Sequence, residues 1–144
     1  MNTVSRYRCL IDRYWLISFV RQSESKSVTF KELLEWAPPL SRTARCRDLS
    51  FIVGKKYLLK EKKEGIHSIY SFNKRFEEKF KRIDAVISEW LAFSTLHRSK
   101  VWNDQPVLEE TTPRKFRHYL SGLARDRDAV KQFFVEFQKI GIEL

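Results

Sequence analysis

The sequence contains few of the residues that mark disulfide-rich, metal-binding, low-complexity or membrane-spanning proteins. Cys9 and Cys46 are the two cysteines among 144 residues, without a C-x-x-C motif or a Cys/His cluster. A disulfide framework and a zinc site are therefore not expected. Glycine and proline number only four each, which excludes collagen-like and linker-rich chains. The longest apolar stretch, Trp15–Val20, is much shorter than the roughly 20 residues of a membrane span.

Hydrophobic residues make up 42% of the chain and aromatic residues 14%, which is too apolar for intrinsic disorder. The length suits one domain, or one small domain with an extension, that needs no metal or disulfide to hold its core. Residues 1–8 are not followed by the apolar segment of a signal peptide. We therefore expect a folded cytoplasmic protein, associated with the nucleoid if it is bacterial.

The positive charge lies in one part of the chain. The formal net charge is +10, and residues 1–82 carry 19 Lys+Arg against 9 Asp+Glu, whereas residues 83–144 carry 9 of each. Such asymmetry favours a polyanionic partner for the N-terminal part. A solvated basic surface without a partner is the alternative.

The N-terminal part shows helical spacing followed by a hairpin pattern. Thr29 and Glu32 have the spacing of a capping box, and Val28 and Leu33 that of a hydrophobic staple. Gly54 is placed to end a helix. The predicted elements are a helix over about Ser5–Gln22, a helix over Phe30–Trp36 that ends before Pro38-Pro39, a helix over Arg42–Val53, and strands over Tyr57–Lys62 and Ile66–Phe72 joined near Gly65.

This order resembles the winged helix-turn-helix family of DNA-binding domains. The resemblance covers about residues 5–72, and Leu49-x-x-Ile52 followed by Tyr57-Leu58 is similar to a recognition helix that runs into its wing. The glycine usual before the first strand of a wing would fall at Lys56, two residues after Gly54. The resemblance implies a mainly α fold, with three helices and a β-hairpin wing in residues 1–72 and a helical region in residues 73–144.

The resemblance also implies that the third helix enters the major groove of duplex DNA, where arginine can read guanine. We expect Cys46, Leu49, Ile52 and Val53 to face the core. Thr43, Arg47 and Ser50 would then point outward, with Arg42 and Arg45 on the flanks and Lys60 near the hairpin tip. The predicted DNA-binding residues are Ser41, Arg42, Thr43, Arg45, Arg47, Ser50, Lys55, Lys56, Lys62, Lys63 and His67.

The C-terminal part predicts a long helix and two shorter ones. The long helix, from Lys74 to about Arg98 with Asn73 as its N-cap, has a heptad-like apolar seam. A helix opens at Thr112-Pro113, and another runs from Asp126 to Gly141. The seam predicts a homodimer, although packing within one chain is the alternative. Its predicted dimerisation residues are Phe76, Phe80, Ile83, Ile87 and Trp90.

These patterns favour a sequence-specific DNA-binding protein that regulates transcription. The alternatives are a replication or partition factor and a winged-helix adaptor that binds a protein, for which the C-terminal helices are another contact surface. We expect no enzyme, cofactor or metal site, since no Gly-rich phosphate loop, nucleophile elbow or metal-ligand cluster is present. Asp48 with Glu61-Lys62-Lys63 only loosely resembles a metal-dependent nuclease site.

Overall fold

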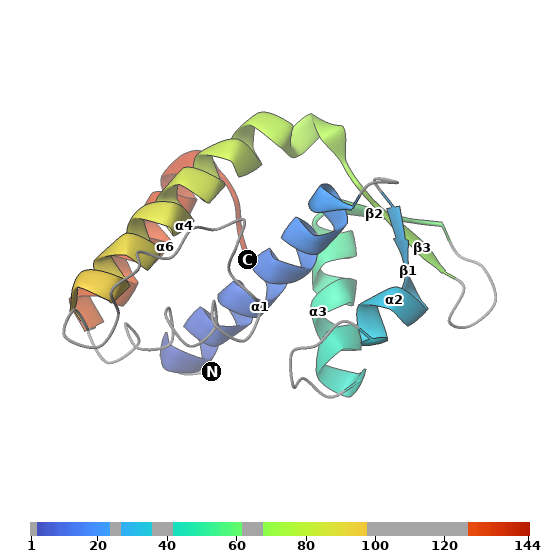
Figure 1. The fold of residues 1–144 in the computed structure, drawn as a ribbon, viewed down its shortest axis with the longest axis horizontal. Coiled ribbons are helices and arrows are strands. Elements are labelled where there is room, and N and C mark those ends of the chain that lie inside the picture. Colours follow the sequence, from blue (N-terminus) through green and yellow to red (C-terminus); the bar gives the residue numbers. More distant parts are fainter. Residues whose placement is uncertain (1–2, 24–26, 36–41, 62–67, 98–126) are drawn as a thin grey trace. The chain divides into compact units, whose positions relative to one another are not determined.

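The computed structural model describes residues 3–23, 27–35, 42–61, 68–97 and 127–144, and its fold is mainly helical with one small antiparallel sheet (Figure 1). None of the described helices is both long and apolar enough to cross a membrane. In chain order the elements are α1 (Thr3–Gln22), β1 (Ser27–Thr29), α2 (Phe30–Glu35), α3 (Arg42–Gly54), β2 (Leu58–Glu61), β3 (Ile69–Phe72), the 3-10 helix η2 (Lys74–Phe76), α4 (Glu77–His97) and α6 (Arg127–Ile140).

Contacts divide the chain into two compact units. The first unit contains Met1–Ile11 and Glu77–Glu143, and the second contains Asp12–Phe76 together with Leu144. Helix α1 therefore contributes its first half to one unit and its second half to the other. The predicted division into residues 1–72 and 73–144 assigns the whole first helix to the N-terminal part.

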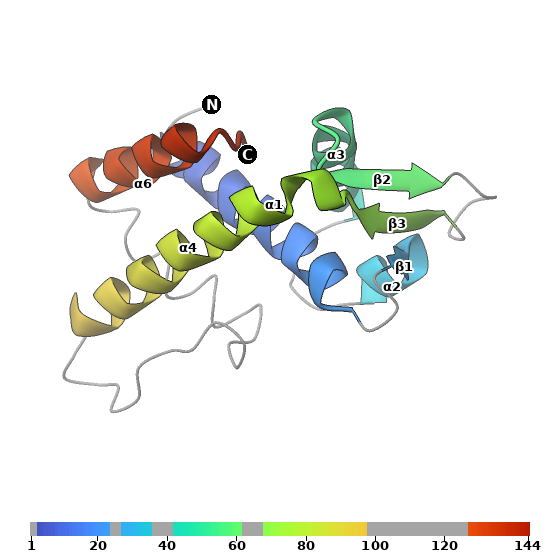
Figure 2. The same ribbon diagram turned by 90° about the horizontal axis from the view of Figure 1, so that it is seen from above.

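The second unit holds a three-stranded antiparallel sheet in the order β1-β3-β2. Strands β2 and β3 form the antiparallel pair predicted from the sequence, with Leu58 opposite Phe72 (Figure 2). Strand β1 pairs with the other edge of β3 and places Val28 opposite Tyr70. The sequence does not predict β1, because three residues are too few to show the alternation that identifies a strand.

The core of the second unit lies between its helices and the sheet. Helix α1 buries Tyr14, Ile17 and Val20 at the three-residue spacing of the predicted helix. The remaining elements each contribute a few apolar side chains. Buried members of this core are Tyr14, Ile17, Val20, Val28, Leu33, Leu49, Ile52, Tyr57, Leu58 and Tyr70.

Helix α2 begins with the predicted capping box. The backbone N–H of Glu32 donates to Thr29 Oγ1 at 3.1 Å, and the backbone N–H of Thr29 donates to Glu32 Oε1 at 3.2 Å. Two backbone donors that a helix start leaves without intrahelical partners are thereby satisfied. Val28 and Leu33, the predicted staple, are both buried.

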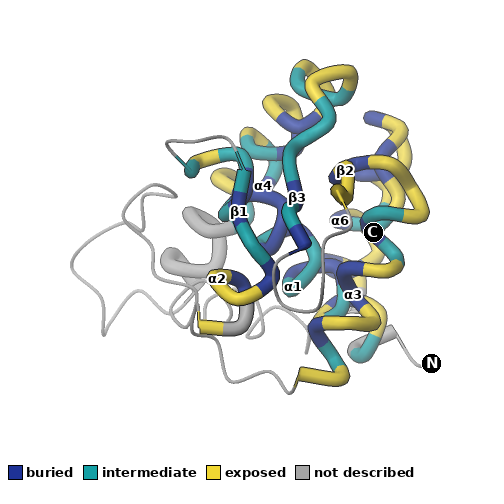
Figure 3. Tube along the Cα trace, turned by 90° about the vertical axis from the view of Figure 1, so that its right-hand side faces the viewer, coloured by how far each residue is buried: buried dark blue, intermediate teal, exposed yellow. Residues whose placement is uncertain are grey.

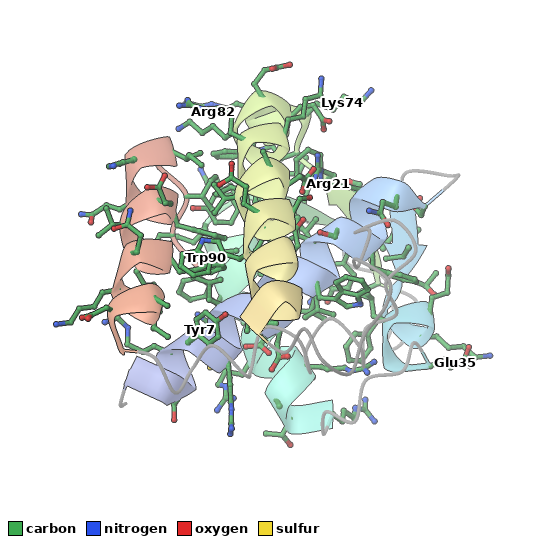
Figure 4. All side chains as sticks on the ribbon, turned by 60° about the vertical axis from the view of Figure 1, so that its left-hand side comes forward. Tyr7, Arg21, Glu35, Lys74, Arg82 and Trp90 are labelled. Carbon is green, nitrogen blue, oxygen red and sulfur yellow. The ribbon has the colours of Figure 1, made fainter. Side chains whose placement is uncertain are left out.

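Aromatic rings fill the core of the first unit. Phe133 of α6 lies 5.2 Å from Tyr7 and 4.9 Å from Phe137, measured between ring centroids. Trp90 of α4 lies 5.7 Å from Phe133, and Figure 4 shows Tyr7 and Trp90 in this group of side chains. Val130, Phe133 and Phe137 thus form the buried face of α6. The predicted helix that opens at Thr112-Pro113 lies outside the described residues.

Gly141 ends α6, as predicted. Its φ of 88° is the left-handed conformation. The N–H groups of Gly141 and Ile142 both donate to the carbonyl of Phe137, at 3.1 and 3.2 Å. This arrangement satisfies a carbonyl that the last helical turn leaves without a partner.

Asn73 precedes the long helix, as predicted for its N-cap. The N–H of Arg75 donates to Asn73 Oδ1 at 3.2 Å, and the N–H of Phe76 donates to the Asn73 carbonyl at 3.0 Å. The first turn is therefore the 3-10 helix η2, and α4 follows it from Glu77.

Candidate nucleic-acid interface

Helix α3 has a buried face and an exposed face, both within the second unit. Its buried residues recur with helical spacing, and Figure 3 shows buried and exposed positions alternating along the helix. The buried residues are Arg45, Asp48, Leu49 and Ile52. The exposed face carries Arg42, Thr43, Cys46, Arg47 and Ser50. The predicted outward positions of Thr43, Arg47 and Ser50 are confirmed.

The predictions for Arg45 and Cys46 are wrong. Arg45 is 2% exposed, whereas Cys46 is exposed. An arginine is expected at the surface because isolated buried charges are costly, yet Arg45 has a partner inside. Its Nη1 donates to the carbonyl of Leu33, near the end of α2. Arg45 is therefore not available to contact DNA.

The environment of Arg45 shows how the interior accommodates this charge. Burial lowers the pKa of Arg45, and the negative charge of Asp12 on α1 acts in the opposite direction. A guanidinium near the last carbonyls of a helix also interacts favourably with the helix dipole. Arg45 thus links α3 to both α1 and α2.

A second polar contact joins α1 to α3, one turn of α3 after Arg45. Arg13 Nε lies 3.1 Å from Asp48 Oδ1, and Arg13 Nη1 donates to the carbonyl of Leu144 at 2.9 Å. The same guanidinium lies 3.8 Å from the ring centroid of Phe51. On α1, Asp12 interacts with Arg45 and its neighbour Arg13 interacts with Asp48. Each acidic residue is therefore matched with a basic residue on the other helix. These buried contacts hold α3 in one orientation.

The turn that leads from α3 to β2 places two lysines on the surface. Lys56 has a φ of 65°, and the N–H of Tyr57 donates to the carbonyl of Ile52 at 3.2 Å. This is the helix-ending motif in which glycine is common. Gly54 is predicted to end the helix, but it is the last residue of α3, and Lys56 takes the left-handed position. Lys55 and Lys56 are both exposed.

A hollow of about 500 Å³ lies between α3 and the sheet. Lys60 Nζ on β2 lies 5.8 Å from the ring centroid of Tyr70, and the guanidinium of Arg42 lies 5.7 Å from that of Phe30. Burial, and then the neighbouring Cys46, raise the pKa of Tyr70. The lining residues are Phe30, Cys46, Leu49, Ser50, Val53, Gly54, Lys60, Ser68 and Tyr70.

The described structure thus brings part of the predicted site together. Arg42, Thr43, Arg47 and Ser50 share the exposed side of α3. Lys55 and Lys56 follow at its C-terminal end. Cys46 and Tyr70, which line the hollow, are not among the predicted site residues. The signal in the sequence for Tyr70 is its position on one face of a strand with Ser68 and Phe72. The predicted residues Ser41, Lys62, Lys63 and His67 lie outside the described residues.

The predicted dimerisation residues are packed within one chain. Phe80, Ile83 and Ile87 of α4 are 0% exposed. Trp90 contacts the ring of Phe133 within the first unit, while the Phe76 ring centroid lies 5.0 Å from that of Tyr57 within the second. A dimer that used these side chains would first have to expose them. The homodimer itself stays a prediction.

The acidic residues offer little for a nuclease site in the described part of the chain. Asp48 is paired with Arg13, and no group of three His, Cys, Asp or Glu residues that could hold a metal ion occurs among the described residues. Lys62 and Lys63 lie outside them.

Comparison with known proteins finds no relative: no protein family, no curated protein and no solved structure matches the chain significantly.

Proposed function

We propose that the protein is a sequence-specific double-stranded DNA-binding protein of the winged helix-turn-helix type and that it regulates transcription. The order α1-β1-α2-α3-β2-β3, with β1 added to the hairpin sheet, supports this proposal. Helix α3 has the sequence position of the recognition helix, directly before the hairpin that would serve as the wing.

The observation that carries the proposal is the separation of polar residues between the two faces of α3. The inward residues Arg45 and Asp48 have partners on α2 and α1. The outward residues Arg42, Thr43 and Arg47 are exposed. A helix that is fixed on one side and offers arginines on the other is preorganised for the major groove, whose width admits one helix.

Different residues would have different roles at the duplex. Arg47, near the middle of the exposed face, would read a base edge, since a guanidinium can bond guanine O6 and N7 together. Lys55, Lys56 and Lys60 would contact phosphates, which give affinity without reading sequence. The ring of Phe30 beneath Arg42 would restrict where its guanidinium lies.

Selection of bound fragments from genomic DNA, followed by affinity measurements at several salt concentrations, tests the proposal. With about five phosphates neutralised, log K should fall against log salt with a slope of roughly −4 to −5. Arg47→Ala should reduce the preference for the selected site over random DNA by about tenfold or more. Lys60→Ala should weaken binding to both duplexes equally.

The matched control is Lys131→Ala, which removes an exposed cation from α6 and should leave both affinities unchanged. Absence of any duplex binding at low salt would contradict the proposal. Equal losses on selected and random DNA from Arg47→Ala would contradict the assigned role of α3.

A protein-binding adaptor is the second candidate, because Leu59 on the edge strand β2 is 49% exposed. An exposed edge strand can pair with an extended segment of another protein. Leu59→Lys separates the two functions. It should leave DNA affinity unchanged or slightly higher, whereas an adaptor would lose its partner.

The proposed homodimer would place two α3 helices on half-sites about 34 Å apart. Light scattering at micromolar concentration should then give twice the chain mass of 17.3 kDa, and the selected sites should be palindromic. A monomer bound to sites without symmetry would contradict the dimer and leave the DNA-binding proposal intact.

A further inference from the structure

Two segments of the second unit carry only positive charges, and each is followed directly by a glutamate, Glu61 or Glu77. Gly54–Lys60 contains Lys55, Lys56 and Lys60, and Ser68–Phe76 contains Lys74 and Arg75. Neither segment contains Asp or Glu. The first segment leads out of α3 into the sheet, and the second leads out of the sheet into η2.

Asn73 joins these segments at the end of the strand pair. Its backbone N–H donates to the carbonyl of Tyr57 at 3.0 Å, and its Nδ2 donates to the carbonyl of Lys56 at 2.9 Å. The Asn73 Oδ1 accepts the N–H of Arg75 at 3.2 Å. The backbones of Lys56 and Arg75 are therefore both bonded to one side chain.

Four cationic residues flank this junction in sequence. Lys55, Lys56, Lys74 and Arg75 are exposed, and Figure 4 shows the side chain of Lys74 extending away from the helix. Of the glutamates that follow in α4, Glu78 is paired with a lysine of its own helix: its Oε1 lies 3.3 Å from Lys81 Nζ. These four cationic residues are called the junction cluster below.

We infer that the junction cluster is a second phosphate-binding surface, which contacts the backbone of the same duplex beyond the groove that α3 would occupy. The inference rests on the proposed DNA binding and assigns it two further residues, Lys74 and Arg75. Two of the cluster's lysines continue directly from the C-terminal end of α3, so docking of α3 brings the cluster to the DNA surface. Phosphate is the matching ligand because lysine contacts phosphates as a point charge and needs no base edge.

The test measures the salt dependence of binding to a mixed-sequence duplex of about 30 base pairs, for which phosphate contacts supply essentially all the affinity. The variant is Lys74→Gln/Arg75→Gln, which removes two charges but no buried side chain. Its slope of log K against log salt should be shallower by about 2, one for each phosphate that the variant no longer neutralises. Its ratio of affinities for selected and random DNA should stay unchanged.

The matched control is Lys131→Gln/Lys139→Gln, which removes two cations exposed on α6 and should leave the slope unchanged. Circular dichroism of each variant shows that the fold is retained. As a positioning test, Asn73→Ala should also make the slope shallower, because the cations at the junction are no longer held together.

The outcomes separate the two claims. If the wild type binds the duplex and Lys74→Gln/Arg75→Gln keeps its slope, the junction cluster does not contact phosphates, while the proposed function stands. The same holds if the α6 control lowers the slope equally, since the loss then reflects net charge alone. If the wild type binds no duplex at low salt, both claims are wrong.

Discussion

Arg13 and Asp48 form an ion pair that joins α1 to α3, with Nε and Oδ1 3.1 Å apart and side chains only 12% and 3% exposed. Loss of one member leaves the other charge in the interior without its partner, which is more costly than removing both. Asp48 belongs to the buried face of α3 and Arg47 to its exposed face, so the pair fixes the helix without occupying the proposed interface.

Asp48→Ala should lower the free energy of unfolding by about 3 kcal/mol, because it leaves the Arg13 guanidinium without its carboxylate. Urea denaturation monitored by circular dichroism measures this loss. The double variant Arg13→Met/Asp48→Leu should recover at least half of it. A single variant as stable as the wild type would show that the pair does not hold α3.

Two glycines at helix ends should respond in opposite directions to alanine. Gly141→Ala should destabilise by about 1–2 kcal/mol, because φ is 88° and an added Cβ would lie 3.3 Å from Lys79 Nζ. Gly54→Ala should stabilise by about 0.5–1 kcal/mol, since it is helical and an added Cβ would meet nothing within 4 Å. Thermal unfolding of both variants shows whether the stability falls for Gly141→Ala and rises for Gly54→Ala. A loss of stability in both would contradict the assigned ends of α3 and α6.

Lys56→Gly should stabilise the protein by about 0.5–1 kcal/mol, because the lysine holds a φ of 65° that costs a side-chain residue about that much or more. The measurement is the midpoint of urea unfolding. Lys55→Gly is the matched control at the neighbouring position and should not stabilise. DNA affinity should fall equally in both variants if each lysine contacts one phosphate.

Thr29→Ala should cost about 1 kcal/mol, because it removes the side-chain acceptor for the N–H of Glu32. Thr29→Ser retains that acceptor and is the control. Both are compared by urea unfolding at neutral pH. If alanine and serine are equally stable, the capping box contributes nothing measurable.

Tyr7 should make the protein less stable at alkaline pH. Burial raises the pKa of Tyr7 well above its usual 10.0. The unfolded chain therefore ionises near pH 10 while the folded chain stays neutral, so stability present below pH 10 is lost as the pH rises further. Tyr7→Phe should reduce this loss by about 1 kcal/mol per pH unit above pH 10. Unfolding measured at pH 7, 10 and 11 checks it, and parallel curves for both proteins would contradict it.

Local chemistry made much of the fold predictable from the sequence. The Thr29–Glu32 capping box, the end of α6 at Gly141 and the start of the long helix after Asn73 each depend on residues within a few positions of one another. The antiparallel pairing of β2 and β3 joins segments that are further apart, but they are consecutive in the chain and so form a hairpin pattern in the sequence. The outward positions of Thr43, Arg47 and Ser50 also followed from helical spacing.

Contacts between segments far apart in the sequence decided the features that the sequence did not predict. Arg45 and Asp48 are polar, so spacing alone assigns them to the surface, whereas their partners Leu33, Asp12 and Arg13 on other helices make their burial favourable. Strand β1 exists because β3 offers it an edge. From the sequence alone, the apolar seam of α4 could pack against a second chain or within its own chain. In the structure the aromatic rings of α6 cover the seam within one chain. The sequence by itself determined where most helices begin and end, since those signals are local. The tertiary structure decided that the charged residues Arg45 and Asp48 are buried, since burial of a charge depends on the partner that meets it.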